Sequence, residues 1–168
     1  IPDITKKNSD FLENKFLDTD GGKFQTSNSE IIDKFNSITG IYERRYAPDE
    51  INCSDLAAVA AGLAINDSKL DQETLDYIIV AHNTGDISCS SGQVDTLPSV
   101  ASKVKAKLKI KNPNCVAYDI ICGCPGWVEG IIQAKSFIKS GMAEKCLVVG
   151  CDTLSRILDE NDRDSMIY

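Results

Sequence analysis

The chain has 168 residues, 42% of them hydrophobic and 26% charged, a composition typical of a soluble globular domain with its own core. The net charge of −7 argues against a nucleic-acid surface, which needs a basic patch. No apolar run approaches the roughly 20 residues of a membrane span, and the polar N-terminus does not resemble a signal peptide. We therefore expect a cytoplasmic protein without nucleic-acid or membrane partners.

Seven cysteines could suggest a disulfide framework or a metal site. Their number is odd, and five lie in or beside apolar segments: Cys115, Cys122, Cys124, Cys146 and Cys151. This pattern favours buried thiols of a cytosolic protein. Cys122 and Cys124 form a C-x-C pair rather than the usual zinc knuckle, and no second pair follows at zinc-finger spacing. We expect no metal, and a thiol- or metal-binding module stays an alternative.

The first half of the chain begins with a polar, irregular segment over residues 1–37. Within it, residues 29–36 could form a short helix capped by Ser29. An alanine-rich helix over residues 56–64, introduced by residues 52–55, is suited to close packing. The mostly apolar run 75–81 predicts a buried parallel strand.

The second half continues the alternation of helices and strands. Residues 97–108 predict an amphipathic helix with Pro98 near its first turn, and residues 115–121 predict a strand. A helix follows and stops at Gly141, before a third buried strand over 146–151. This order predicts a layered α/β domain with a largely parallel sheet.

Ligands of such sheets bind beyond the carboxyl ends of the strands, where loops lead into helices. Three polar or reactive clusters follow the predicted strands, at residues 82–84, 122–126 and 152–155. Together they predict a single site. We interpret His82, the only histidine, as a strand-end residue with a local hydrogen bond rather than as a catalytic group.

Cys124 is the strongest candidate for chemistry, because it lies where a strand turns directly into a helix. The unpaired N–H groups and the dipole of a helix N-terminus favour the nucleophilic thiolate, which predicts acyl transfer through a thioester. Pro125 suits the first helical position, and Gly123 and Gly126 allow close approach. The backbone N–H of Cys124 could contribute to an oxyanion hole. Cys122 is interpreted as a buried thiol.

Several segments, in order and spacing, resemble β-ketoacyl-acyl-carrier-protein synthase III from about Thr39 to the C-terminus. They are residues 39–45, 76–81, 119–126, 139–141, 147–152 and 162–163. The resemblance implies a thiolase-like fold of which this chain is the N-terminal half. It makes residues 38–168 a nucleophile-bearing half-domain and residues 1–37 a polar segment of the same domain. We interpret the chain as a fragment, with the opening strand clipped before Ile1 and the C-terminal half absent.

The resemblance also implies a reaction. Cys124 aligns with the cysteine that accepts an acyl group from coenzyme A, before condensation with malonyl-acyl carrier protein releases carbon dioxide. It implies a homodimer that needs no cofactor besides its coenzyme A thioester substrate. Members of the family use a histidine and an asparagine from the second half of their chain to polarise the malonyl thioester and stabilise the enolate. His82, which precedes Cys124, does not match the position of that histidine. A non-catalytic half-fold subunit of a heteromer, a hydroxymethylglutaryl-coenzyme A synthase and a polyketide starter enzyme stay alternatives.

Substrate contacts are implied at a few more positions. Lys34 and Ile38 stand where many members carry a Trp and an Arg that sandwich adenine, so the stacking and the charge are lost. Arg163 matches a nucleotide contact, or else forms a salt bridge with Asp159 or Asp162. Leu97 matches a residue that reaches the acyl tunnel of the partner subunit, or else it is a staple at a helix start. Trp127 is expected to pack in the core.

Overall fold

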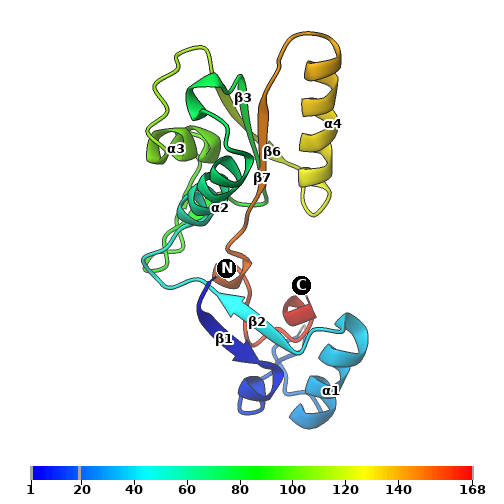
Figure 1. Cartoon of the computed structure of the whole chain (residues 1–168). Helices are drawn as coiled ribbons and strands as arrows, with labels where there is room; N and C mark the ends of the chain where they lie inside the picture. The colour runs from blue at the N-terminus through cyan, green and yellow to red at the C-terminus, as the bar shows by residue number, and fades with distance from the viewer. Residues whose placement is uncertain (1, 19, 168) are drawn as a thin grey trace. The chain divides into compact units, whose positions relative to one another are not determined.

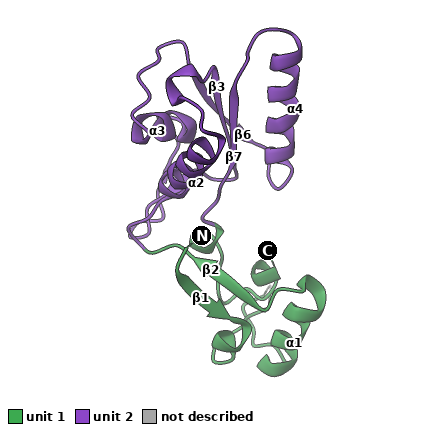
Figure 2. Cartoon of the chain, in the orientation of Figure 1, with its two compact units in different colours: residues 1–48, 154–168 green, residues 49–153 purple. Residues whose placement is uncertain are grey.

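The computed structural model describes residues 2–18 and 20–167. It consists of two compact units, residues 49–153 and residues 1–48 with 154–168, which Figure 2 shows in two colours. The two ends of the chain thus contribute to one unit, and each unit is described by itself below. The expected organisation, with 1–37 as a segment of the domain formed by 38–168, stays a prediction.

A three-stranded parallel sheet forms the centre of the unit 49–153 (Figure 1). Its strands are β3 (Tyr77–His82), β6 (Val116–Ile121) and β7 (Cys146–Gly150), in the order β6-β3-β7. Each strand lies within one or two residues of its predicted range, and the predicted parallel sheet is confirmed. Residues 78–82 of the central strand β3 are all buried, because helices cover both faces of the sheet.

Three helices cover this sheet: α2 (Cys53–Ser68), α3 (Val100–Lys107) and α4 (Gly126–Lys139). In Figure 1, α2 and α3 lie against one face and α4 lies against the other. Ala57 and Ala61 of α2 are completely buried, since their small side chains let the helix approach the sheet closely. The same unit contains a short 3₁₀ turn (Gln72–Thr74) and a small antiparallel pair of strands, β4 (Asp86–Ile87) and β5 (Val94–Asp95).

Helix α3 begins later than the sequence predicts. Its N-cap is Ser99, whose side chain accepts a hydrogen bond from the N–H of Ser102. Pro98 therefore lies directly before the N-cap, with a cis peptide bond from Leu97. Its predicted place near the first turn is confirmed, while the helix itself starts at Val100 rather than at Leu97. A serine that supplies a side-chain acceptor is a stronger start signal than a proline one residue earlier.

The other unit combines an antiparallel pair of strands, β1 (Ile4–Lys7) and β2 (Glu43–Tyr46), with helix α1 (Asn28–Thr39). Its three short 3₁₀ turns are η1 (Asn8–Phe11), η3 (Leu154–Arg156) and η4 (Ser165–Ile167). An aromatic core holds it together: Phe11, Phe16, Ile31, Ile32, Phe35 and Met166. The prediction that residues 1–37 are irregular is wrong for β1, whose polar residues hide its pairing with β2.

Candidate active site

The carboxyl ends of β3 and β7 are joined just beyond the sheet. Asp152, two residues after β7, accepts two hydrogen bonds from Asn83, which follows β3. One comes from the backbone N–H, at 2.8 Å, and one from the side-chain Nδ2, at 2.6 Å. The N–H of Cys151 also donates to the carbonyl of Ala81 at 3.0 Å. Two of the three predicted clusters are therefore directly linked.

The third cluster, the turn that carries Cys124, lies against the same residues. Cys124 is exposed between the end of β6 at Ile121 and the start of α4 at Gly126. Gly123 adopts a φ of +68°, a left-handed conformation that favours glycine, and its carbonyl accepts the N–H of Gly126 at 3.0 Å. A Cβ placed on Gly123 would lie 3.6 Å from Oδ1 of Asn83. Residues of all three predicted clusters thus meet at this sheet edge, and that they form a single site stays a prediction.

The start of α4 differs from the prediction in one position. Pro125 is the N-cap rather than the first helical residue, with a φ of −78°. It supplies no side-chain acceptor to the first turn. The N-terminus of α4, which directly follows Cys124 and Pro125, is therefore not capped by a side chain of Pro125, and an uncapped helix N-terminus attracts negative charge.

Helix α4 approaches the strand ends very closely. A Cβ on Gly126 would lie 3.1 Å from Cβ of Ala81, and one on Gly150 would lie 3.2 Å from Cβ of Trp127. Trp127 packs on β7 in this way but is 50% exposed, so the prediction that it belongs to the core is wrong. It stands on the first turn of α4.

The buried His82 of β3 pairs with the half-buried Asp119 of β6. Nε2 of His82 lies 3.0 Å from Oδ2 of Asp119, and His82 is only 3% exposed. Asp119 also accepts the N–H groups of Val100 and Ala101, each at 2.7 Å. Burial raises the pKa of Asp119, but these hydrogen bonds outweigh burial and leave the pKa below its usual value. The local hydrogen bond expected for His82 is confirmed.

The sequence interpretation missed Asp119 as the partner of His82. A carboxylate in the middle of an apolar strand was the available signal, because a charge is rarely buried without partners. Since Asp119 accepts from the N-terminus of α3, it fixes that helix on the sheet.

The other cysteines divide into buried and exposed thiols. Cys53 and Cys115 are buried, and Cys146 and Cys151 are half-buried. Burial raises the pKa of Cys115 and Cys146, which keeps them as unreactive thiols. Cys122 is exposed, so the prediction of a buried thiol is wrong: β6 ends one residue earlier, and Cys122 already belongs to the turn.

Metal and membrane signals are absent from the part of the chain that the structure describes. Within residues 2–18 and 20–167, no group of three or more His, Cys, Asp or Glu residues is arranged to hold a metal ion. Among these residues, none of the helices combines the length and the apolar character needed to cross a bilayer.

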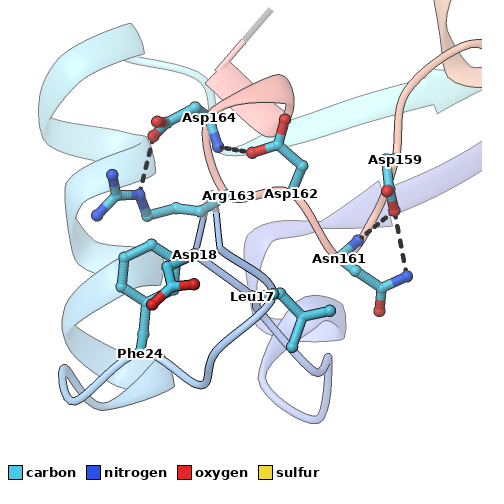
Figure 3. A pocket seen from close by; sticks show the side chains of 9 residues that line it. Leu17, Asp18, Phe24, Asp159, Asn161, Asp162, Arg163 and Asp164 are labelled. Atoms are coloured by element: carbon cyan, nitrogen blue, oxygen red, sulfur yellow. Dashed lines mark hydrogen bonds and ion pairs between the residues drawn. The ribbon is translucent and has the colours of Figure 1, made fainter.

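Arg163 lines a pocket of about 450 Å³ in the unit formed by the chain ends (Figure 3). Its guanidinium lies 4.4 Å from the ring centroid of Phe24, and its Nε donates to Asp164 at 2.9 Å. The predicted salt bridge to Asp159 or Asp162 is therefore wrong. Oδ1 of Asp159 accepts from Asn161 and Oδ1 of Asp162 accepts from the N–H of Asp164, so both carboxylates are used within their own loop.

Leu97 belongs to the unit 49–153 and is 82% exposed. A hydrophobic staple has to pack against its own helix, so the interpretation of Leu97 as a staple is wrong. Lys34 and Ile38, on α1, are exposed as well.

Comparisons with known proteins agree with this geometry. The family model described as 3-oxoacyl-[acyl-carrier-protein] synthase III matches residues 118–168, which begin just before the turn of Cys124. A β-ketoacyl-[acyl-carrier-protein] synthase III of Neisseria gonorrhoeae is 42% identical over 129 residues, 77% of this chain and 38% of the relative. One from Helicobacter pylori is 36% identical over 167 residues, 99% of this chain and 44% of the relative.

The chain belongs to the β-ketoacyl-acyl-carrier-protein synthase III family. Among solved structures, the 3-oxoacyl-[acyl-carrier-protein] synthase III of Aquifex aeolicus matches 99% of this chain and 46% of its own, at 32% identity and a TM-score of 0.75. The synthase III of Thermus thermophilus matches 99% and 44%, also at 32% identity and a TM-score of 0.75. The expected thiolase-like fold is confirmed. The chain spans 38–44% of the length of the curated synthase III relatives compared above.

Proposed function

We propose that Cys124 accepts an acyl group from an acyl-coenzyme A thioester, as the first step of a synthase III reaction in fatty-acid biosynthesis. The observation that carries this proposal is the exposed thiol of Cys124, two residues before α4, at the edge where three strand ends meet. The membership in the synthase III family supports it.

The proposed step is a transthioesterification. The thiolate of Cys124 attacks the thioester carbonyl carbon, and a new C–S bond forms as the carbonyl oxygen becomes an oxyanion. The oxyanion then collapses, the bond to the coenzyme A sulfur breaks, and that sulfur leaves as a thiolate that takes up a proton. One thioester replaces another, so the reaction needs no oxidant and little driving force.

The turn of Cys124 suits this chemistry electrostatically. N–H groups at a helix N-terminus such as the start of α4 stabilise an oxyanion that develops beside them. Pro125 offers no competing side-chain acceptor there. By contrast, the hydrogen bond with Cys151 and burial raise the pKa of Cys53 far above its usual value, so Cys53 is not a candidate nucleophile.

The later steps and the setting belong to the same proposal. We infer that the acyl group on Cys124 condenses with malonyl-acyl carrier protein, with loss of carbon dioxide, and that acyl-coenzyme A and acyl carrier protein are the partners. A homodimer in the cytoplasm, with no cofactor besides the substrate, fits the acidic composition and the family. The names of the relatives themselves support an acyl carrier protein as a substrate.

Arg163 and Leu97 are the proposed substrate-binding residues. Among the described residues that line the pocket of Figure 3, Arg163 alone is cationic, and a guanidinium is a preferred partner of a phosphate. Four aspartates line the same pocket, so the proposal for Arg163 depends on its match to the family position. Leu97 presents an exposed apolar side chain, which is what contact with an acyl chain or with a second copy of the protein requires.

The test is mass spectrometry of the product of the complete gene after incubation with acetyl-coenzyme A and other short-chain acyl thioesters. We expect an acyl adduct in the original protein and in Cys122→Ala, and none in Cys124→Ala. Cys122 is the matched control because it is also exposed and lies in the same turn. No adduct with any of these donors would refute the proposal.

A further inference from the structure

The hydrogen bonds between Asn83 and Asp152 fix which way the Asn83 amide faces. Asp152 accepts from the backbone N–H with Oδ1 and from Nδ2 with Oδ2, so the Asn83 side chain has to turn its donor toward the carboxylate. Its carbonyl oxygen, Oδ1, then necessarily faces the other way, toward Gly123. An ionised carboxylate accepts only, so the reversed amide would place two oxygens against each other.

The turn of Cys124 lies close to this side chain. Gly123 precedes Cys124 directly, and a Cβ on Gly123 would be in van der Waals contact with Oδ1 of Asn83, at 3.6 Å. The start of α4 on the other side of Cys124 is held by close contact between Gly126 and Ala81, two residues before Asn83. The end of β3 therefore lies close to the turn on both sides of the cysteine.

The backbone next to Asp152 is held by a second set of hydrogen bonds. Asp152 follows Cys151, whose Sγ donates to the carbonyl of Cys53 at 3.3 Å, while Sγ of Cys53 donates to the carbonyl of Cys151 at 3.3 Å. These reciprocal bonds tie the end of β7 to the N-terminus of α2. Asp152 thus projects from a fixed backbone, and it can orient Asn83 rather than follow it.

We propose that Asn83 is a positioning residue for Cys124, and that Asp152 holds Asn83 in the orientation that supports the cysteine turn. The inference rests on the proposed role of Cys124 as the acyl-accepting nucleophile. Neither Asn83 nor Asp152 reacts. Their effect is to keep the turn of Cys124 in a defined position at the start of α4, because a nucleophile and the N–H groups beside it act together only in a defined geometry.

The first experiment measures the rate at which iodoacetamide alkylates Cys124 in the product of the complete gene, read by peptide mass spectrometry. Asn83→Ala should slow this reaction about tenfold, because small displacements of a reacting group cost large factors in rate. Asn83→Ser keeps a donor toward Asp152 but lacks the oxygen beside Gly123, and should slow it similarly. Buried Cys53 and Cys115 serve as internal controls, since their alkylation reports loss of the fold.

The decisive variant exchanges the two partners. Asn83→Asp alone sets two carboxylates against each other, so Cys124 should be alkylated most slowly in this variant. Combined with Asp152→Asn, it restores one amide and one carboxylate in swapped places, and should recover most of the alkylation rate. The proposal is overturned if folded Asn83→Ala and Asn83→Ser react at the original rate, or if the swapped pair stays as slow as Asn83→Asp.

Acylation by acetyl-coenzyme A gives a second readout, and it separates this inference from the proposed function. We expect Asn83→Ala to lower kcat about tenfold and leave KM nearly unchanged, because Asn83 acts on the nucleophile and not on substrate binding. If the original protein is not acylated at all while alkylation still depends on Asn83, the proposed function fails and the positioning role stands. If acylation proceeds unchanged in folded Asn83→Ala, the positioning role fails and the proposed function stands.

Discussion

At the scale of single residues, the polar groups of the candidate site work in pairs that no single motif reveals. The sequence identified His82, Asn83 and Cys124 as members of one sheet edge, because strand ends of a parallel sheet converge. It could not assign Asp119 to His82 or Asp152 to Asn83, because these partners lie 37 and 69 residues apart along the chain. Spacing along the chain predicts local neighbours, while such pairs depend on strand register.

Asp119→Asn should destabilise the protein at neutral pH by about 2 kcal/mol, because it weakens hydrogen bonds to a buried charged acceptor. The folded-state pKa of Asp119 is depressed, so its charge stabilises the fold above the unfolded pKa of about 4. That stability is lost as the pH falls through the folded pKa. Urea unfolding should therefore show that the difference in free energy of unfolding between the original protein and Asp119→Asn becomes smaller as the pH falls. Asp33→Asn, at an exposed position, is the control and should change the stability little at any pH. A difference in free energy of unfolding between the original protein and Asp119→Asn that does not depend on pH would contradict this account.

Arg163→Ala should raise KM for acetyl-coenzyme A about tenfold, since a charge-assisted hydrogen bond is worth about 1.5–3 kcal/mol. Arg163→Lys keeps the charge but loses the planar contact with Phe24, and should give an intermediate KM. Asp164→Ala removes the neighbouring carboxylate and should lower KM or leave it unchanged. Steady-state kinetics measure KM for acetyl-coenzyme A in each variant. An unchanged KM in Arg163→Ala would show that Arg163 does not bind the substrate.

At the scale of helices and strands, the sequence predicted the elements of the unit 49–153 well and their first residues less well. Apolar runs identified β3, β6 and β7 because these strands are covered by helices. The N-cap of helix α1 is Ser27 rather than Ser29, since Ser27 forms a capping box with Glu30. The signal was available in the sequence, because only Ser27 is followed three residues later by a glutamate, while Ser29 is followed there by Ile32.

Helix α4 lies so close to the sheet that Gly130→Ala should destabilise the protein. A Cβ on Gly130 would lie 2.7 Å from Cγ1 of Val148. Overpacking costs about 1–3 kcal/mol, which outweighs the roughly 1 kcal/mol that alanine gains over glycine in a helix. Thermal and urea unfolding measure the change.

Gly62→Ala in α2 is the matched control, because its Cβ would lie at an ordinary 3.6 Å from Cδ2 of Leu108. That variant should gain about 0.5–1 kcal/mol. Adding Val148→Ala to Gly130→Ala should return part of the lost stability, since it makes room for the new methyl group. If Gly130→Ala is as stabilising as Gly62→Ala, the close packing of α4 described above is wrong.

At the scale of the whole molecule, the alternation of helices and strands predicted the parallel sheet, but nothing in it predicted that both chain ends form one unit. Strands β1 and β2 pair across more than 30 intervening residues, and neither has an apolar face that would mark it. Family resemblance supplied the thiolase-like fold, which the structural comparisons confirm.

Residues 1–168 produced alone should self-associate, because α4 exposes a row of large apolar side chains. Trp127, Val128 and Ile132 are each about half exposed, and contiguous apolar surface of this kind favours association. Sedimentation velocity should show concentration-dependent oligomers, and Val128→Lys with Ile132→Lys should shift them toward monomer. A monomer at all concentrations would contradict the expectation.

The central claim is that Cys124, and not its neighbour Cys122, carries the acyl group. Fragmentation mass spectrometry of the peptide that contains both cysteines, taken after brief exposure of the complete gene product to acetyl-coenzyme A, tests it most directly. The account predicts the acyl group on Cys124 alone, and its loss when malonyl-acyl carrier protein is added. An acyl group on Cys122, or an unmodified peptide, would contradict it.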